Sequence, residues 1–175
     1  MSAGAALRAS ALIFVAALLQ VAIVSSLVFA GGAPDLLLVV VVCVGLLRGS
    51  VPGAIIGFAG GLLVDLLTID TLGVTSLVLT LAGFWAGRYG ETTGRGRRVA
   101  PLVAVGLITV LAGVFGFTLH YLLGEAVIAR HALFTALAPA LVVNLALAYP
   151  VYTLVRATVG ERRTIEPSAE VEVVV

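Results

Sequence analysis

The sequence predicts an all-α integral membrane protein, built as one compact bundle of six transmembrane helices, and three observations lead to this prediction. Of its 175 residues, 61% are hydrophobic and only 11% are charged, against about 25% charged residues in an ordinary soluble domain. The mean hydropathy is +1.21. Charged residues interrupt the apolar runs at intervals close to the roughly 20 residues that a membrane-spanning helix needs. The single cysteine excludes a disulfide scaffold, and the net charge of +1 excludes a basic nucleic-acid-binding module.

Six apolar segments divide the chain, and they form one transmembrane domain over residues 1–160. The predicted spans are 9–30, 34–47, 51–69, 72–87, 99–123 and 132–155. The remaining residues, 161–175, are predicted to be a cytoplasmic tail. Its charged composition favours disorder, or a short strand added to the edge of a partner's sheet.

The first two segments each allow a second interpretation. The first is longer than the roughly 7 to 15 apolar residues of a signal peptide, so an uncleaved helix is favoured over a cleaved one. The second reaches only about 21 Å, against a hydrocarbon core of about 30 Å. It either crosses fully or forms a re-entrant hairpin with the third segment. Two full crossings are favoured because a hairpin leaves Arg48 at depth, which costs roughly 2.5 to 3.5 kcal/mol.

The third segment carries small residues on one face. Gly53, Gly57 and Gly61 recur at four-residue steps and lead to Asp65, so they form a slowly winding stripe on a helix. Helices in lipid associate where small residues let their backbones approach. We therefore predict that this stripe packs the bundle or receives the single helix of a partner.

Basic residues predict the orientation. All of them are arginine, and with six spans Arg130 alone falls on the opposite side from the others. The positive-inside rule then places both termini in the cytoplasm, with a membrane that the chain crosses several times. A basic loop over residues 88–98 is either a topology determinant or a dock for anionic lipid or a partner. Its arginines are Arg88, Arg95, Arg97 and Arg98.

A few polar residues within the spans form the candidate polar contact site. Asp35, Asp65, Thr75 and His120 are predicted to lie toward the outer side, whereas Asn144 lies in the middle of the sixth span. Each is either a contact to a partner or ligand, or a residue satisfied locally within the bundle. No catalytic residue, cofactor or metal site is predicted, because the chain has no lysine for a P-loop and no HExxH or GxSxG motif.

Several short motifs over residues 34–90 occur in an order that resembles a known family. They are Pro34-Asp35, Arg48-Gly49, Gly53, Gly57-Phe58, Gly60-Gly61-Leu62, Asp65-Leu66-Leu67, Leu72-Gly73 and Ala86-Gly87-Arg88. In these residues the chain resembles the bacterial rod shape-determining protein MreD family. The resemblance implies a non-enzymatic membrane component of the elongation machinery, which helps determine rod shape by linking bitopic MreC, MreB filaments and the peptidoglycan synthases, RodA and its transpeptidase.

The resemblance also supplies an alternative function. The MreD fold is similar to the substrate-binding components of energy-coupling-factor vitamin transporters, which are six-helix bundles with an outward-facing ligand pocket. The alternative is therefore a substrate-binding component of a vitamin-type transporter, with the outer polar residues lining its pocket. The scarcity of polar and aromatic groups within the spans favours the scaffold over the pocket.

Overall fold

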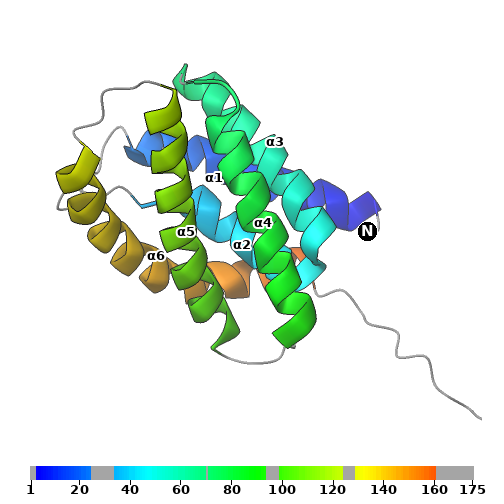
Figure 1. The fold of residues 1–175 in the computed structure, drawn as a ribbon. Coiled ribbons are helices and arrows are strands. Elements are labelled where there is room, and N and C mark those ends of the chain that lie inside the picture. The colour runs from blue at the N-terminus through cyan, green and yellow to red at the C-terminus, as the bar shows by residue number, and fades with distance from the viewer. Residues whose placement is uncertain (1–2, 25–33, 70, 94–98, 124–128, 161–175) are drawn as a thin grey trace, which may run out of the picture.

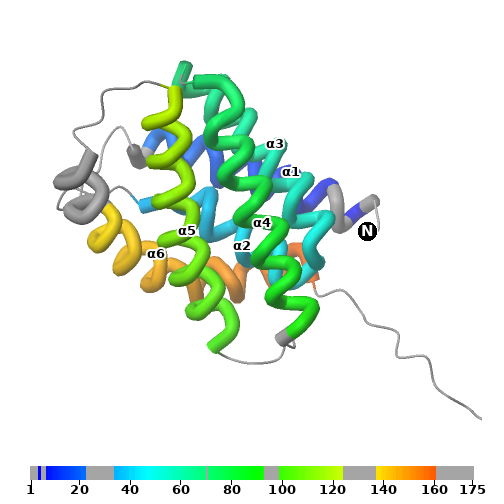
Figure 2. The backbone as a smooth tube through the Cα atoms, viewed as in Figure 1, coloured from blue at the N-terminus to red at the C-terminus, as the bar shows by residue number. Residues whose placement is uncertain are grey.

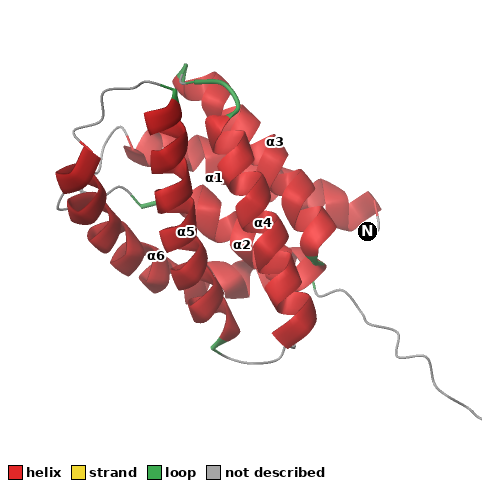
Figure 3. Ribbon diagram, in the orientation of Figure 1, coloured by secondary structure: helices red, strands yellow, loops and turns green. Residues whose placement is uncertain are grey.

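The computed structural model describes residues 3–24, 34–69, 71–93, 99–123 and 129–160, and within them helices are joined by short loops, with no strand (Figure 3). The predicted all-helical class is confirmed. The described helices follow the order of the predicted segments. They are α1 Ala3–Val24, α2 Leu36–Arg48, α3 Ser50–Thr68, α4 Val74–Thr93, α5 Ala100–Leu122 and α6 Ala129–Val159.

Three helical stretches are long and apolar enough to cross a membrane: Ser50–Thr68, Ala100–Leu122 and Leu137–Val159. The apolar stretches of α1 and α2 are shorter, Leu7–Ala22 and Leu36–Arg48. At 1.5 Å per residue, the 13 residues of α2 reach about 20 Å. These helices identify a membrane protein, and crossing by all six remains a prediction.

Helix α2 lies at the centre of the bundle and contacts each of the other five helices. Those five form a closed ring around it in the order α1, α3, α4, α5, α6, with α6 returning to α1 (Figures 1 and 2). All residues from Leu37 to Leu47 are buried. A helix that is apolar on every side can take such a position without burying a polar face.

Helices α3, α4 and α5 lie side by side and alternate in direction (Figure 1). The end of α3, the start of α4 and the end of α5 therefore meet at one end of the bundle. The contact between α3 and α4 is the most extensive in the molecule, and the contact between α1 and α6 is the least extensive within the ring.

The helix ends differ from the predicted spans in one place that matters for the site. Helix α4 continues to Thr93, past the predicted end at residue 87, so Arg88 lies on a helix and its placement in a loop was wrong. The added turns are stabilised by contacts of Tyr89 with the core and of Glu91 with the start of α3. The other predicted loop arginines (Arg95, Arg97 and Arg98) and the predicted tail lie outside the described residues.

Candidate functional site

The glycine stripe of α3 faces α4 of the same chain. A Cβ atom added at Gly53 would overlap the carbonyl oxygen of Gly83, and one added at Gly57 would overlap the carbonyl oxygen of Leu79. At Gly61 the nearest backbone atom of α4 would be 2.5 Å away. Real Cβ contacts essentially never fall under 3.0 Å. The backbones of α3 and α4 therefore touch along the whole stripe, and this face is occupied within the chain.

Glycines of α4 and α2 complete this contact from the other side. A Cβ at Gly87 would overlap the backbone of Ser50, at the start of α3. A Cβ at Gly45 of α2 would lie 2.6 Å from the carbonyl oxygen of Gly83, and one at Gly90 would lie 2.6 Å from that of Leu46. Helices α2, α3 and α4 therefore form a block held by direct backbone contact.

Asp65, near the end of α3, caps the start of α4. Its Oδ2 atom accepts hydrogen bonds from the backbone N–H groups of Gly73, at 2.8 Å, and Ser76, at 3.4 Å. These N–H groups belong to the first turn of a helix, where no intrahelical acceptor exists. The side chain is only 1% exposed, and its Oδ1 atom is buried without a hydrogen-bond partner among the described residues. Asp65 thus acts as an N-cap supplied by a neighbouring helix.

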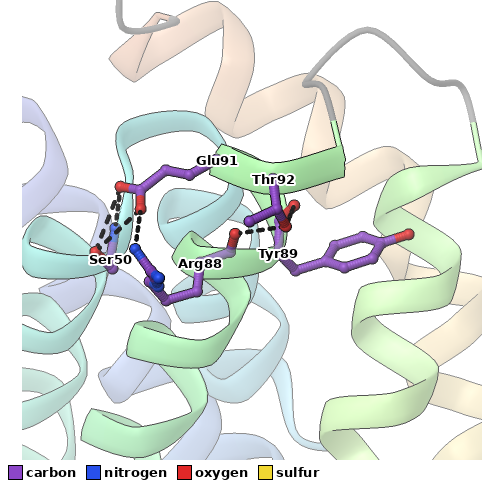
Figure 4. Close-up of polar contacts among 5 residues, drawn as sticks. All are labelled: Ser50, Arg88, Tyr89, Glu91 and Thr92. Atoms are coloured by element: carbon purple, nitrogen blue, oxygen red, sulfur yellow. Dashed lines mark hydrogen bonds and ion pairs between the residues drawn. The ribbon is translucent and has the colours of Figure 1, made fainter.

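Glu91, near the end of α4, makes the matching contact at the other end of the pair (Figure 4). Its Oε1 atom accepts hydrogen bonds from the backbone N–H of Ser50, at 3.0 Å, and from the Ser50 hydroxyl, at 3.3 Å. Ser50 is the first residue of α3. Each helix of the pair therefore caps the other, and we call Asp65 and Glu91 the two carboxylate caps.

Arg88 and its neighbours complete this end of α4 (Figure 4). The guanidinium of Arg88 lies 3.7 Å from Oε2 of Glu91, and its side chain is 57% exposed. Thr92 donates to the carbonyl oxygens of Arg88 and Tyr89. Tyr89 points away from the ion pair, toward the seam with α5, and with Val103 it lines a groove there.

A second polar group lies inside the bundle, at the start of α2. Asp35 is the N-cap of α2, and its side chain accepts from the N–H of Leu38 at 2.9 Å. The backbone N–H of Asp35 donates to Oδ1 of Asn144, in α6, at 3.0 Å. The amide of Asn144, which is fully buried, donates in turn to the hydroxyl of Thr109, in α5, at 3.3 Å.

Gln20 of α1 binds the same helix start. Its amide nitrogen donates to the carbonyl oxygen of Pro34 at 3.0 Å, and its Oε1 atom accepts from the N–H of Leu36 at 2.8 Å. Side chains from α1 and α6 thus bond directly to the segment that opens α2, and α5 supports them through Thr109. These bonds satisfy backbone groups at the start of α2, which have no intrahelical partner.

The predicted site residues therefore do not gather in one place. Asp35 lies with Asn144 in the interior, whereas Asp65 bonds to the start of α4. Thr75 is the second residue of α4, next to the capped turn, and His120 lies half-buried in the last turn of α5, at the same end of the bundle.

Four residues that the sequence did not single out belong to these groups. They are Gln20, Ser50, Glu91 and Thr109. The signal for Gln20 was present, because an amide within an apolar span needs a hydrogen-bond partner just as Asn144 does. No group of three or more metal-ligating side chains occurs in the part of the chain that the structure describes.

Two apolar grooves follow the seams of the ring. One runs between α4 and α5 and is lined at one end by Trp85, Arg88 and Tyr89. The other has a volume of about 630 Å³ and runs between α1 and α6, with α2 as its floor. We call them the α4–α5 groove and the α1–α6 groove.

One of the comparisons with known proteins identifies a family. A family model for the rod shape-determining protein MreD matches residues 4–159, a range that takes in nearly all of the six helices. None of the curated proteins and none of the solved structures matches the chain, so the expected similarity to transporter components receives no support from known structures. The chain belongs to the family of the rod shape-determining protein MreD, a structural family not known as enzymatic, and its role lies in determining rod shape from a membrane.

Proposed function

We propose that this protein is a non-enzymatic membrane component of the cell-elongation machinery, which helps determine rod shape by linking three partners. These are a bitopic MreC-like protein, MreB filaments, and the peptidoglycan synthases, RodA and a transpeptidase. Family membership supports the role in shape, and the links to these partners are the proposal.

One observation carries the proposal of a scaffold rather than a ligand-binding component. Three polar side chains within the bundle bond to the ends of the chain's own helices: buried Asp65 to the start of α4, and half-buried Asp35 and Gln20 to the start of α2. Polar groups used in this way fix the relative positions of helices. A ligand pocket instead needs convergent polar groups that remain open to the ligand.

The distribution of arginine supports the proposed orientation, with several crossings and both termini in the cytoplasm. Arg48, at the end of α2, donates to the carbonyl oxygen of Val159, at the end of α6. Arg8 of α1 lines the α1–α6 groove together with Thr158. Arg88 lies beside the start of α3, which follows directly on α2. Arginines from three helices therefore gather at one end of the bundle, as the positive-inside rule requires of a cytoplasmic face.

The direct test is to purify the tagged protein from its own membranes in a mild detergent and identify co-purifying proteins by mass spectrometry. We expect a bitopic MreC-like protein together with wall synthases. Recovery of a transmembrane coupling protein with paired ATPases would instead identify a transporter component and overturn the proposal.

A depletion strain tests the role in cell shape. Wild-type protein and the Gly116→Ala variant should restore rods, because a Cβ at Gly116 would only make an ordinary contact, 3.8 Å from Val78. Gly57→Leu should leave round or widened cells. Normal rods and normal co-purification with Gly57→Leu would contradict the need for the α3–α4 contact.

A further inference from the structure

The α1–α6 groove lies at the seam with the least extensive helix–helix contact in the ring. Its walls run from Arg8 to Leu19 on α1 and from Val151 to Thr158 on α6, and its floor is formed by Leu36 and Val40 of α2. Its volume of about 630 Å³ lies within the range of about 300 to 1,000 Å³ that is typical of ligand-binding pockets. Because α1 and α6 are kept apart here, a surface of the central helix faces the groove.

The length of the groove matches one leaflet of a bilayer. From Arg8 to Leu19 the rise along α1 is about 16 Å, roughly half of a hydrocarbon core of about 30 Å. Directly after Leu19, the side chain of Gln20 joins α1 to the start of α2 through Pro34 and Leu36. An extended hydrocarbon chain that enters from the membrane surface reaches this depth.

A transmembrane helix of a partner fits the groove less well. Such a helix continues through both leaflets and packs where small residues let the backbones approach. The glycine-rich faces of α2, α3 and α4 are already in contact with the chain's own backbone. The walls of the groove, in contrast, carry branched aliphatic side chains such as Leu12, Val15 and Leu154.

Among the described residues that line the groove, Arg8 is the one charged side chain, and Thr158 lies at the same end of the groove. Arg48 is bonded just beyond, at the carbonyl oxygen of Val159. A guanidinium forms charge-assisted hydrogen bonds with phosphate oxygens, often two at once. The groove thus has a basic end at the membrane surface and an apolar lining that extends through about one leaflet.

We propose that the α1–α6 groove binds one anionic phospholipid, with its phosphate at Arg8 and an acyl chain between α1 and α6 over Val40. In the orientation proposed above, this lipid belongs to the cytoplasmic leaflet. The bound acyl chain fills the α1–α6 groove.

Native mass spectrometry of the full chain, released from detergent micelles, tests the site. The protein is titrated with phosphatidylglycerol and, separately, with phosphatidylcholine of the same acyl chains. We expect the first phosphatidylglycerol to bind at least about fivefold more tightly, in line with the effect of one basic residue near anionic lipid. Arg8→Gln should remove this preference, and Ala157→Trp, which fills the groove from an exposed position of α6, should weaken binding of both lipids.

Matched controls keep the proposal open to refutation. Arg88→Gln removes an exposed arginine of the α4–α5 groove and should leave the preference unchanged. Loss with Arg88→Gln but not with Arg8→Gln would assign the lipid to that other groove. Equal affinity of the wild-type protein for both lipids would also overturn the proposal. Glycerol phosphate, a headgroup without acyl chains, should not compete, and full competition would indicate a site for soluble anions instead.

The groove-filling variant needs a check on folding. Val15 lines the same groove and is 53% exposed, so Val15→Trp provides a second obstruction from the opposite wall. Both variants should elute as the wild-type protein does on size exclusion. If both are folded and both still bind phosphatidylglycerol with wild-type affinity, the acyl chain does not lie in this groove.

Discussion

The seam between α3 and α4 and the seam between α1 and α6 belong to the same ring but are built in opposite ways. Along the first, glycines bring the two backbones into contact, and a carboxylate caps a helix start at each end. Along the second, leucine and valine side chains hold the helices apart and leave a groove. The α3 face has Gly53, Gly57 and Gly61 at four-residue steps. Among its described residues, the groove face of α1 has no glycine and carries Leu12, Val15 and Leu19 together with two alanines.

This contrast reflects how helices associate in lipid. Lipid tails are as apolar as leucine, so no hydrophobic force drives two leucine-rich helices together. Close backbone packing and hydrogen bonds provide the attraction instead. The first seam has both, whereas the groove along the second is lined almost entirely by apolar side chains in the part of the chain that the structure describes.

Gly57→Leu should have the largest effect on stability, because it disrupts the close contact between α3 and α4. A leucine there must push α4 away, because even a Cβ would overlap the carbonyl oxygen of Leu79. We expect the free energy of unfolding to fall by about 3 kcal/mol or more, measured by SDS titration of the protein in mixed micelles. Gly116→Ala is the matched control and should change it by less than about 0.5 kcal/mol. Equal losses of stability in the two variants would show that the α3–α4 contact does not depend on glycine at position 57.

A smaller loss is expected from Asp65→Leu. The change leaves the N–H groups of Gly73 and Ser76 without their acceptor in a buried place, at a cost of about 1 to 3 kcal/mol. Asp65→Asn keeps a carbonyl oxygen that can accept from both groups and should retain most of the stability. Hydrogen exchange at these two amides distinguishes the variants, with fast exchange expected only for leucine. Slow exchange in Asp65→Leu would mean that the start of α4 finds another acceptor.

Glu91→Ala should cost less, about 0.5 to 1 kcal/mol. This cap has the same chemistry, but the Glu91 side chain is 26% exposed, so water can replace its oxygen at the N–H of Ser50. The same SDS titration measures the change. A loss as large as that of Asp65→Leu would show that burial does not separate the two carboxylate caps.

The smallest effect is expected at the α1–α6 seam. Val15→Ala removes two methyl groups from a side chain that is 53% exposed, and it should change the free energy of unfolding by less than about 0.5 kcal/mol. A loss above about 1 kcal/mol in lipid-free detergent would mean that α1 and α6 are held together more firmly than their contact indicates. The contrast between the two seams would then be weaker than described.

The sequence predicts the fold class and the order of the helices well, because both depend on where apolar runs begin and end. It also identifies the small face of α3, since four-residue spacing is a local property. It does not predict that α2 lies at the centre of a ring. The run from Leu36 to Leu47 is apolar on every side, and a helix of that kind can face either lipid or protein.

The candidate polar site is predicted less well, for a geometric reason. The position of a residue within its span predicts its depth in the membrane, and Asp65, Thr75 and His120 lie where the ends of α3 and α5 meet the start of α4. Depth gives no position around the bundle, and Asp35 therefore appears from the sequence to be near Asp65 although it bonds to Asn144. Glu91 was missed because its partner, Ser50, is apparent only once α4 is known to extend past residue 87.

The bond between Asp35 and Asn144 constrains how the chain can be made. It joins residues 109 positions apart, linking the start of α2 to a helix that is synthesised much later. Until α6 arrives, the backbone N–H of Asp35 lacks the acceptor that it has in the finished bundle. The central helix is thus synthesised well before α6 but reaches its final state only once α6 is in place.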